Sequence, residues 1–287
     1  MKSLIGAILI GVTLSSSTAL AGGNVTYSMV PGRNGHYLIS GDGSDNTVVL
    51  ENTILPDGRT KGLLLSGGGS TTINGQVSVM LTATQDLRFE LGEGSDKLIV
   101  ADVDIPFQRI SVNAGYDDDL DSFFIYRTRC ENISLQWADK VKIEDVKVVQ
   151  DLSINKYVGT FSYMHLDLLI ADSRVHSQLT IDGTGKNDLA KIRDSQFDGD
   201  TAMDFDAGHD ILEMSGVLFA KMTADFGRGD DYLRCTGQVI CAAGSSVLGG
   251  SEGRRNRRAI ADNDSLFISG PVAVYLGSAS GWTNSNY

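Results

Sequence analysis

Acidic side chains recur beside glycines in this sequence, in a pattern that suits calcium chemistry. Three segments read Gly-x-Gly-x-Asp, at residues 41–45, 92–96 and 227–231. Carboxylates and turn carbonyls supply the hard oxygen ligands that calcium prefers, typically about six to eight per ion. The motif and the neighbouring acidic clusters predict calcium ligands among Asp96, Asp117, Asp118, Asp119, Asp121, Asp210, Asp230 and Asp231.

The same residues could instead serve only the turns. Glycine adopts positive φ without steric cost, and aspartate accepts hydrogen bonds from the N–H groups of a turn. Asp96 shows the choice: it either caps its own turn or also shares an ion with the acidic residues 117–121 of the next corner. Both alternatives remain open at the level of the sequence.

Glycoside cleavage is a second chemistry that paired carboxylates could perform, because such enzymes place two carboxyl groups beside the scissile bond. The candidates for catalysis are His209, Asp210, Asp230 and Asp231. The remaining histidines lie far apart in the sequence, without the spacing of metal ligands. Serine-hydrolase, phosphate-loop, zinc and dinucleotide motifs are absent from the sequence.

The chain has three cysteines, Cys130, Cys235 and Cys241. Cys235 and Cys241 could close a short disulfide loop in an exported protein. Cys235 also falls on an apolar position of the repeat described below, where a thiol would be a small core residue. The sequence leaves these two alternatives open.

The elements that must position these residues follow an internal repeat. Apolar residues alternate before each corner and again after it, as in Phe89, Leu91, Gly94, Leu98 and Val100. Alternation with period two predicts short strands with one buried face. The corners recur every 21 to 26 residues, about 23 on average, at Gly43, Gly68, Gly94, Gly115, Ala138, Gly159, Gly185, Gly208, Gly229 and Gly250.

A repeat of this length cannot bury its inner face alone, but stacked repeats bury a continuous core. We therefore predict an all-β fold, a single parallel β-helix of about ten coils over residues 41–277. Residues 22–40 would form an N-terminal lead-in or cap, and residues 278–287 a polar tail. A leucine-rich repeat lacks support because its fixed asparagine is missing, and the regular spacing disfavours a β-sandwich.

In repeat length and pattern the chain resembles the right-handed parallel β-helix superfamily, the pectate-lyase-like solenoids. That resemblance implies an exported protein in which a carbohydrate groove could run along an outer sheet. The Gly-x-Gly-x-Asp corners at residues 92–96 and 227–231 also resemble units of the calcium-binding repeat of RTX proteins. RTX sites need tandem nine-residue units, whereas these corners are about 23 residues apart.

Composition limits the partners. The formal net charge is −12, which argues against nucleic acid and anionic membranes. Residues 1–21 have the layout of a cleavable secretory signal, with a short apolar run and Ala19-Leu20-Ala21 before the cut. We expect a secreted protein, extracellular or in the periplasm or cell envelope, without a membrane span.

The function we expect is that of an exported, non-enzymatic β-helix protein, a surface or matrix scaffold or an adhesive module that calcium could stabilise. Its partner would be a polysaccharide or a cell-surface component. The alternative is a polysaccharide lyase or glycoside hydrolase that acts on an acidic polysaccharide. Few aromatic side chains are available to stack on sugars, since the chain has only two tryptophans, Trp137 and Trp282.

Overall fold

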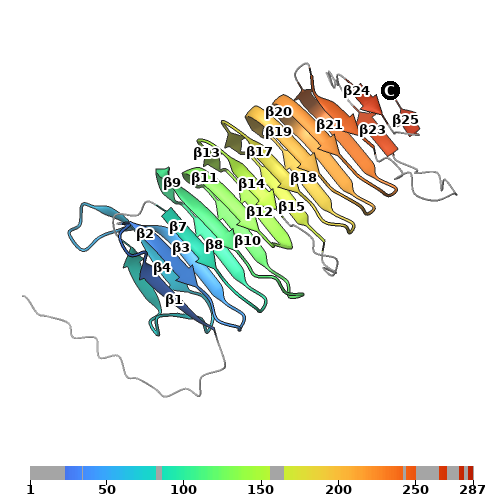
Figure 1. Cartoon of the computed structure of the whole chain (residues 1–287). Helices are drawn as coiled ribbons and strands as arrows, with labels where there is room; N and C mark the ends of the chain where they lie inside the picture. The colour runs from blue at the N-terminus through green and yellow to red at the C-terminus, as the bar shows by residue number, and fades with distance from the viewer. Residues whose placement is uncertain are drawn as a thin grey trace, which may run out of the picture.

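The computed structural model describes residues 23–33, 35–81, 86–155, 165–241, 244–249, 265–269, 278–280 and 284–286. Over these residues the chain forms strands and no helices. Figure 1 shows the strands wound into one elongated coil, with the first strands at one end and the last at the other. The predicted all-β solenoid with about 23 residues per turn is confirmed. The predicted signal at residues 1–21 lies outside the described residues.

Each full turn contributes strands to three parallel sheets, and the long strands bend from one sheet into the next. Sheet 1 contains β2 (His36–Ser40), β7 (Asp86–Glu90), the ends of β9 (Asp104–Asn113) and β11 (Arg129–Gln136), β14 (Leu152–Asn155), β17 (Leu179–Asp182), the ends of β19 (Gln196–Asp204) and β20 (Ile211–Asp225), β22 (Ser246–Leu248) and β24 (Ser278–Ser280).

Sheet 2 follows sheet 1 along the chain. It contains β3 (Thr47–Ile54), β8 (Lys97–Ala101), β10 (Ser122–Tyr126), β12 (Lys140–Glu144), β15 (Asp167–Ala171), β18 (Leu189–Arg193), the starts of β20 and β21 (Tyr232–Cys241), β23 (Ser265–Ser269) and β25 (Asn284–Asn286). Sheet 3 contains the starts of β9, β11 and β19, the short strands β13 (Lys147–Val148) and β16 (Arg174–Val175), the middle of β20 and the end of β21.

Antiparallel strands extend the stack at the N-terminal end. β1 (Asn24–Met29) pairs with β2, β4 (Lys61–Gly67) with β3, and β6 (Ser78–Leu81) with β4, while β5 (Thr72–Ile73) runs parallel to β1. Because native solenoids need their terminal coils covered, this antiparallel group is a cap built from the chain itself.

The number of coils was predicted wrongly: the solenoid has about seven turns rather than ten. The corner assigned to Gly68 does not belong to a coil, because it lies between the antiparallel strand β4 and β5. β3 instead pairs directly with β8, so that Thr47 is in register with Lys97. The assigned corners Gly159 and Gly250 fall outside the described residues.

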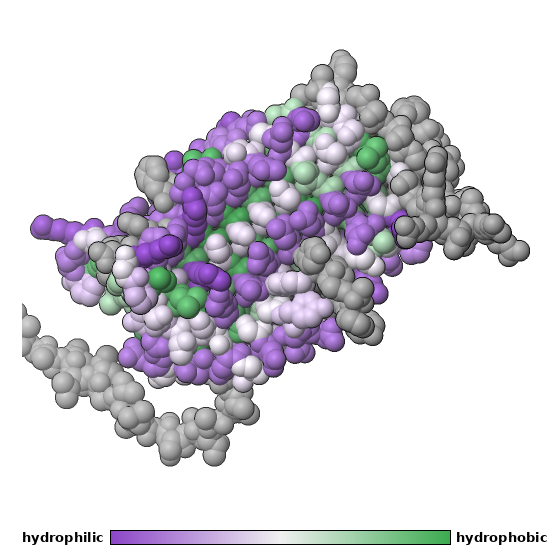
Figure 2. All heavy atoms as spheres, viewed as in Figure 1, coloured by the Kyte–Doolittle hydropathy of each residue, from purple (hydrophilic) through white to green (hydrophobic). Residues whose placement is uncertain are grey.

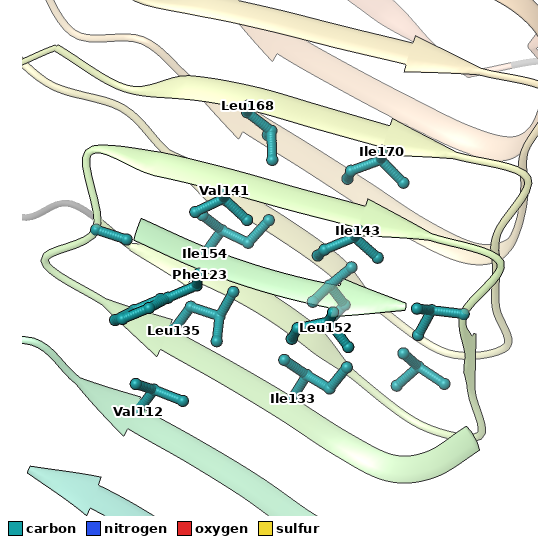
Figure 3. Packing of buried hydrophobic residues seen from close by; sticks show 14 of the residues in the cluster. Val112, Phe123, Ile133, Leu135, Val141, Ile143, Leu152, Ile154, Leu168 and Ile170 are labelled. Carbon is teal, nitrogen blue, oxygen red and sulfur yellow. The ribbon is translucent and has the colours of Figure 1, made fainter. Parts of the chain in front are cut away.

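The core consists of inward side chains stacked coil on coil. Phe123, Val141 and Leu168 occupy one register position on successive strands of sheet 2, and each is 1% exposed or less. Figure 3 shows these residues facing Leu135 and Ile154 from sheet 1 across the interior. Burying each such side chain stabilises the fold by about 1.5–3 kcal/mol. The core therefore holds every corner in a fixed position relative to its neighbours.

The outer surface is mostly polar. Figure 2 shows that hydrophilic residues cover most of the visible face, with small hydrophobic patches between them. Among the described residues, no helix is long and apolar enough to cross a membrane.

Candidate functional site

The predicted acidic residues gather on one edge of the solenoid, where sheet 1 turns into sheet 2. We call this edge the aspartate corner. It comprises residues 41–46, 91–96, 114–121, 137–139, 183–188, 205–210 and 226–231.

Six of these seven corners contain one buried aspartate each, and the six form a row that is hydrogen-bonded from coil to coil in two groups of three. The corner between Asp139 and Asp188 falls outside the described residues. The row, called the aspartate ladder below, consists of Asp96, Asp121, Asp139, Asp188, Asp210 and Asp231, each 5% exposed or less. The backbone N–H of Asp96 donates to Oδ1 of Asp121 at 2.8 Å, and that of Asp121 donates to Oδ2 of Asp139 at 2.9 Å. In the same way, the backbone N–H of Asp188 donates to Oδ1 of Asp210 at 2.7 Å, and that of Asp210 donates to Oδ1 of Asp231 at 2.8 Å. Each carboxyl group thus satisfies a buried backbone donor of the preceding coil.

Burial makes the ladder carboxyl groups hard to ionise. Desolvation raises the pKa of Asp96 to about 7, although the hydrogen bonds from Asn46 oppose the shift. Desolvation likewise raises the pKa of Asp121 to about 8, and the carboxyl groups of Asp117 and Asp96 add to that increase. The pKa of Asp210 is raised to about 8, again mainly by burial. Oδ2 of Asp96 and Oδ2 of Asp210 are buried without a hydrogen-bond partner, which also disfavours a charge there.

The other predicted calcium ligands lie outside the ladder. Asp118, Asp119 and Asp230 are exposed, whereas Asp117 accepts the N–H of Gly94 at 3.1 Å and that of Asp119 at 3.0 Å. Burial raises the pKa of Asp117, and these two hydrogen bonds act against the increase. Among the described residues, no three His, Cys, Asp or Glu side chains are arranged to hold a metal ion. Calcium binding stays a prediction from the motif.

The four catalytic candidates lie on two consecutive coils, but their side chains point to different environments. His209 and Asp230 are exposed, and Nδ1 of His209 accepts the N–H of Asp230 at 3.0 Å. Asp210 and Asp231 are 0% and 1% exposed and belong to the ladder. A substrate at this corner would therefore meet His209 and Asp230 but not the two buried carboxyl groups.

The cysteines are core residues. Cys235 is in register with Met214 on the inner face of sheet 2, and Cys241 with Phe219 in sheet 3. Both thiols are free, so the predicted alternative of a disulfide is not formed in this structure. Burial raises the pKa of Cys235 to about 12 and that of Cys241 to about 11, which keeps both thiols protonated and unreactive.

A groove that the sequence analysis did not predict lies where sheet 2 turns into sheet 3. One residue per coil there adopts a φ between +44° and +67°, at Asp102, Arg127, Asp145, Asp172, Asp194, Gly216 and Gly237. Aspartate tolerates this left-handed conformation better than most residues, which explains its recurrence. Beside this turn runs a cavity of about 510 Å³ across four coils, lined by Val103, Asp104, Arg127, Thr128, Arg129, Asp145, Val146, Lys147, Asp172 and Arg174. We call it the basic groove.

Basic side chains follow one register position along this groove. Arg129 pairs with Lys147, and Lys147 with Arg174, on successive strands of sheet 3. Adjacent strands are about 4.8 Å apart, so these three cations form a row parallel to the solenoid axis. Arg174 is paired with Asp198 at 2.8 Å. Arg129 and Lys147 form no ion pair with any residue in the described part of the chain.

Acidic side chains form the opposite wall of the basic groove. Asp145 and Asp172 occupy the left-handed turn. Arg127 occupies the same turn one coil earlier, where its Nε donates to Oδ1 of Asp102 at 2.6 Å and its Nη2 donates to Oδ2 at 2.8 Å. This pairing lowers the pKa of Asp102 and fixes the Arg127 guanidinium against the turn. The groove therefore presents the row of Arg129, Lys147 and Arg174 beside the carboxylates of the turn, with Asp104 in register next to Arg129 at one end of the row.

Comparison with known proteins adds no family: no family model, curated protein or solved structure matches this chain. The fold is established by the geometry, and the likeness to pectate-lyase-like and RTX proteins rests on the sequence pattern alone.

Proposed function

We propose that this protein is an exported, non-enzymatic scaffold or adhesive module that binds an acidic polysaccharide along the basic groove. The observation that carries the proposal is the row of Arg129, Lys147 and Arg174 at one register position on three successive coils. Arg174 is compensated by Asp198, whereas Arg129 and Lys147 are like charges on adjacent strands, and a bound anion would relieve their repulsion.

The shape of the row supports a polymeric ligand. The groove crosses four coils, a length of roughly 14 Å at the spacing of parallel strands. A chain with repeated carboxylates or sulfates could lie along the solenoid axis and meet the three cations in turn. Arg129 suits such groups because a guanidinium can donate two parallel hydrogen bonds to one carboxylate.

The acidic wall supports a polysaccharide over nucleic acid. Asp145 and Asp172 would repel a dense row of phosphates that has no donor groups between them. In an acidic polysaccharide, hydroxyl groups alternate with the anionic groups. The hydroxyls could donate to the aspartates while the anionic groups contact the cations.

The proposal predicts binding without turnover. Calorimetric titration of the full chain with polygalacturonate and alginate should give saturable binding that weakens as salt is added, because exposed charge pairs are screened. A neutral polymer of similar length, such as dextran, is the matched control and should not compete for the groove. No binding of either acidic polymer at low salt would overturn the proposal.

The alternative is a lyase or hydrolase that acts on the same kind of polymer, and one observation favours it. Nδ1 of His176 lies 2.7 Å from Oδ2 of Asp198, the oxygen that Arg174 also contacts. An imidazole oriented by a carboxylate is suited to general-base chemistry. The assay is the release of unsaturated or reducing ends from the two acidic polymers. Release that His176→Gln abolishes would establish an enzyme and contradict the non-enzymatic proposal.

Calcium at the aspartate corner is a separate proposal that the acidic clusters suggest. Calorimetric titration with calcium after chelation tests it at pH 8, where more of the ladder is ionised. If calcium addition releases no heat and leaves the melting temperature unchanged, the protein does not bind calcium and this proposal is wrong.

A further inference from the structure

An aromatic pair lies on the aspartate corner, away from the basic groove, with Tyr116 exposed and Trp137 partly buried against the core. The rings of Tyr116 and Trp137 are 4.9 Å apart between centroids and meet edge to face at 79°. Tyr116 is 58% exposed, so much of its ring is accessible to a ligand. Trp137 has a φ of +67°, which is strained for a residue with a bulky side chain. The backbone N–H of Trp137 donates to the backbone carbonyl of Asn155 at 3.1 Å. The fold thus holds the pair in place at some cost in stability.

A small polar cleft on the outer face of sheet 1 adjoins this pair along the chain. The cleft has a volume of about 220 Å³ and is lined by Arg88, Phe89, Ser111, Val112, Asn113, Ser134 and Gln136. Ser111 pairs in register with Ser134, and Asn113 with Gln136, so hydroxyl and amide groups form two short rows. No carboxylate lines the cleft.

The aromatic pair follows two of the three strands that line the cleft, β9 and β11. Asn113 is followed three residues later by Tyr116, and Gln136 is followed directly by Trp137. At no more than about 3.3 Å per residue, the Cα atoms of Tyr116 and Trp137 lie within roughly 10 Å of the Cα atoms of Asn113 and Gln136. A ligand in the cleft could therefore extend onto the aromatic pair.

We propose that the cleft and the Tyr116–Trp137 pair form a binding site for an uncharged sugar. Hydroxyl and amide groups can both donate to and accept from sugar hydroxyls, and aromatic rings supply apolar contact area with one fixed orientation. The volume is below the roughly 300–1,000 Å³ of sites for drug-sized ligands, which fits one sugar ring in the cleft.

The surrounding charges disfavour an anionic sugar. Arg88, the one cation of the cleft, is paired with Glu90 at 2.5 Å. Asp117, Asp118 and Asp119 follow Tyr116 directly and would repel a carboxylate on the aromatic side. This site therefore differs in ligand chemistry from the basic groove and does not depend on the proposed function.

Tryptophan fluorescence tests this site. Because Trp137 and Trp282 are the only tryptophans, a Trp282→Phe background leaves Trp137 as the single reporter. The probes are the neutral hexasaccharides of cellulose, starch and laminarin, with an oligogalacturonate as the charged counterpart. We expect a saturable change with at least one neutral probe and none with the oligogalacturonate.

Variants separate binding at this site from a general effect. Tyr116→Ala and Gln136→Ala should each weaken neutral-sugar binding by at least about tenfold, equivalent to 1.4 kcal/mol. Tyr126→Ala, which removes a tyrosine from the outer face of sheet 2, is the matched control and should bind like the parent. Arg129→Glu should also bind the neutral sugar normally, which distinguishes this proposal from the basic groove. No response to any neutral probe up to about 10 mM, or full binding by Tyr116→Ala, would overturn the proposal.

Discussion

The backbone N–H of Asp96 donates to Oδ1 of Asp121 in the next coil at 2.8 Å, deep in the aspartate corner. Both side chains are 2% exposed or less. The contact explains why the corners of this protein keep an aspartate: the side chain is an internal acceptor for the neighbouring coil rather than a surface charge. Its energetic consequences can be measured.

The ladder should make the protein less stable at alkaline pH. The folded-state pKa values of Asp96, Asp121 and Asp210, about 7, 8 and 8, lie above the value of 3.8 that applies to the unfolded chain. The protonated carboxyl groups contribute their full stabilisation of the folded state below pH 3.8. This contribution to the free energy of unfolding is lost as the pH rises through the folded-state pKa values of about 7 and 8. The melting temperature measured by circular dichroism should fall by about 5 °C or more between pH 5 and pH 9. A constant or rising melting temperature would show that the ladder is ionised without cost.

An amide should replace a ladder carboxyl group without loss. Asn46 already occupies the ladder position in the first coil, where it is fully buried and donates its own N–H to Asp96 at 2.8 Å. Asp121→Asn keeps an acceptor for the Asp96 N–H, so its stability at pH 6 should stay within about 1 kcal/mol of the parent and depend less on pH.

Asp121→Ala is the contrasting variant. It leaves the buried N–H of Asp96 without an acceptor, which should cost about 1–3 kcal/mol in urea unfolding. Equal destabilisation by the asparagine and alanine variants would mean that the charge, and not the hydrogen bond, is what the corner requires.

Glycine at the stacked corners should be irreplaceable where two coils touch. A Cβ on Gly229 would lie 1.4 Å from the carbonyl oxygen of Gly208, whereas a Cβ on Gly69 would have no atom within 4 Å. Both glycines have positive φ. Gly69→Ala should cost about 1–2 kcal/mol for its backbone conformation alone, and Gly229→Ala at least about 3 kcal/mol. Thermal unfolding of the two variants compares them, and similar losses would argue against tight contact between corners.

Much of the coil could be predicted because its signal is local. In the segment from Leu91 to Val100, alternation puts Leu91, Leu98 and Val100 inside, and all three are fully buried. Gly94 has a φ of +105°, as expected for the residue that turns the chain. Asp96 accepts a hydrogen bond from a corner N–H, as the simpler alternative predicted, but the donor is Asn46 of the preceding coil and not a residue of its own turn.

The number of coils could not be read from the same pattern. Antiparallel strands β4 and β6 alternate with period two like any coil strand, and Gly68 resembles a coil corner in sequence. Only the pairing of Thr47 with Lys97, 50 residues apart, shows that the intervening segment leaves the stack. Local periodicity carries no information about which strand is the neighbour.

The basic groove was missed for a related reason. Arg129, Lys147 and Arg174 are separated by 18 and 27 residues, because the coils between them differ in length. A row of side chains on a solenoid is defined by register, and register is set by the inward residues. Unequal corner lengths therefore hide an outward row from any fixed spacing in the sequence.

The most direct test of the account is the affinity of two matched double variants for polygalacturonate, measured by calorimetry at low salt. Arg129→Glu with Lys147→Glu reverses two charges of the basic groove, and Lys140→Glu with Lys221→Glu reverses two exposed charges elsewhere. Both variants change the net charge equally, and the control also removes the long surface ion pairs of Lys140 with Asp167 at 4.0 Å and of Lys221 with Asp200 at 3.9 Å, which contribute little to stability. The groove variant should lose at least about tenfold in affinity while the control stays within about threefold of the parent. Equal affinities for the two variants, or turnover of the polymer by the parent protein, would contradict a groove that binds without catalysis.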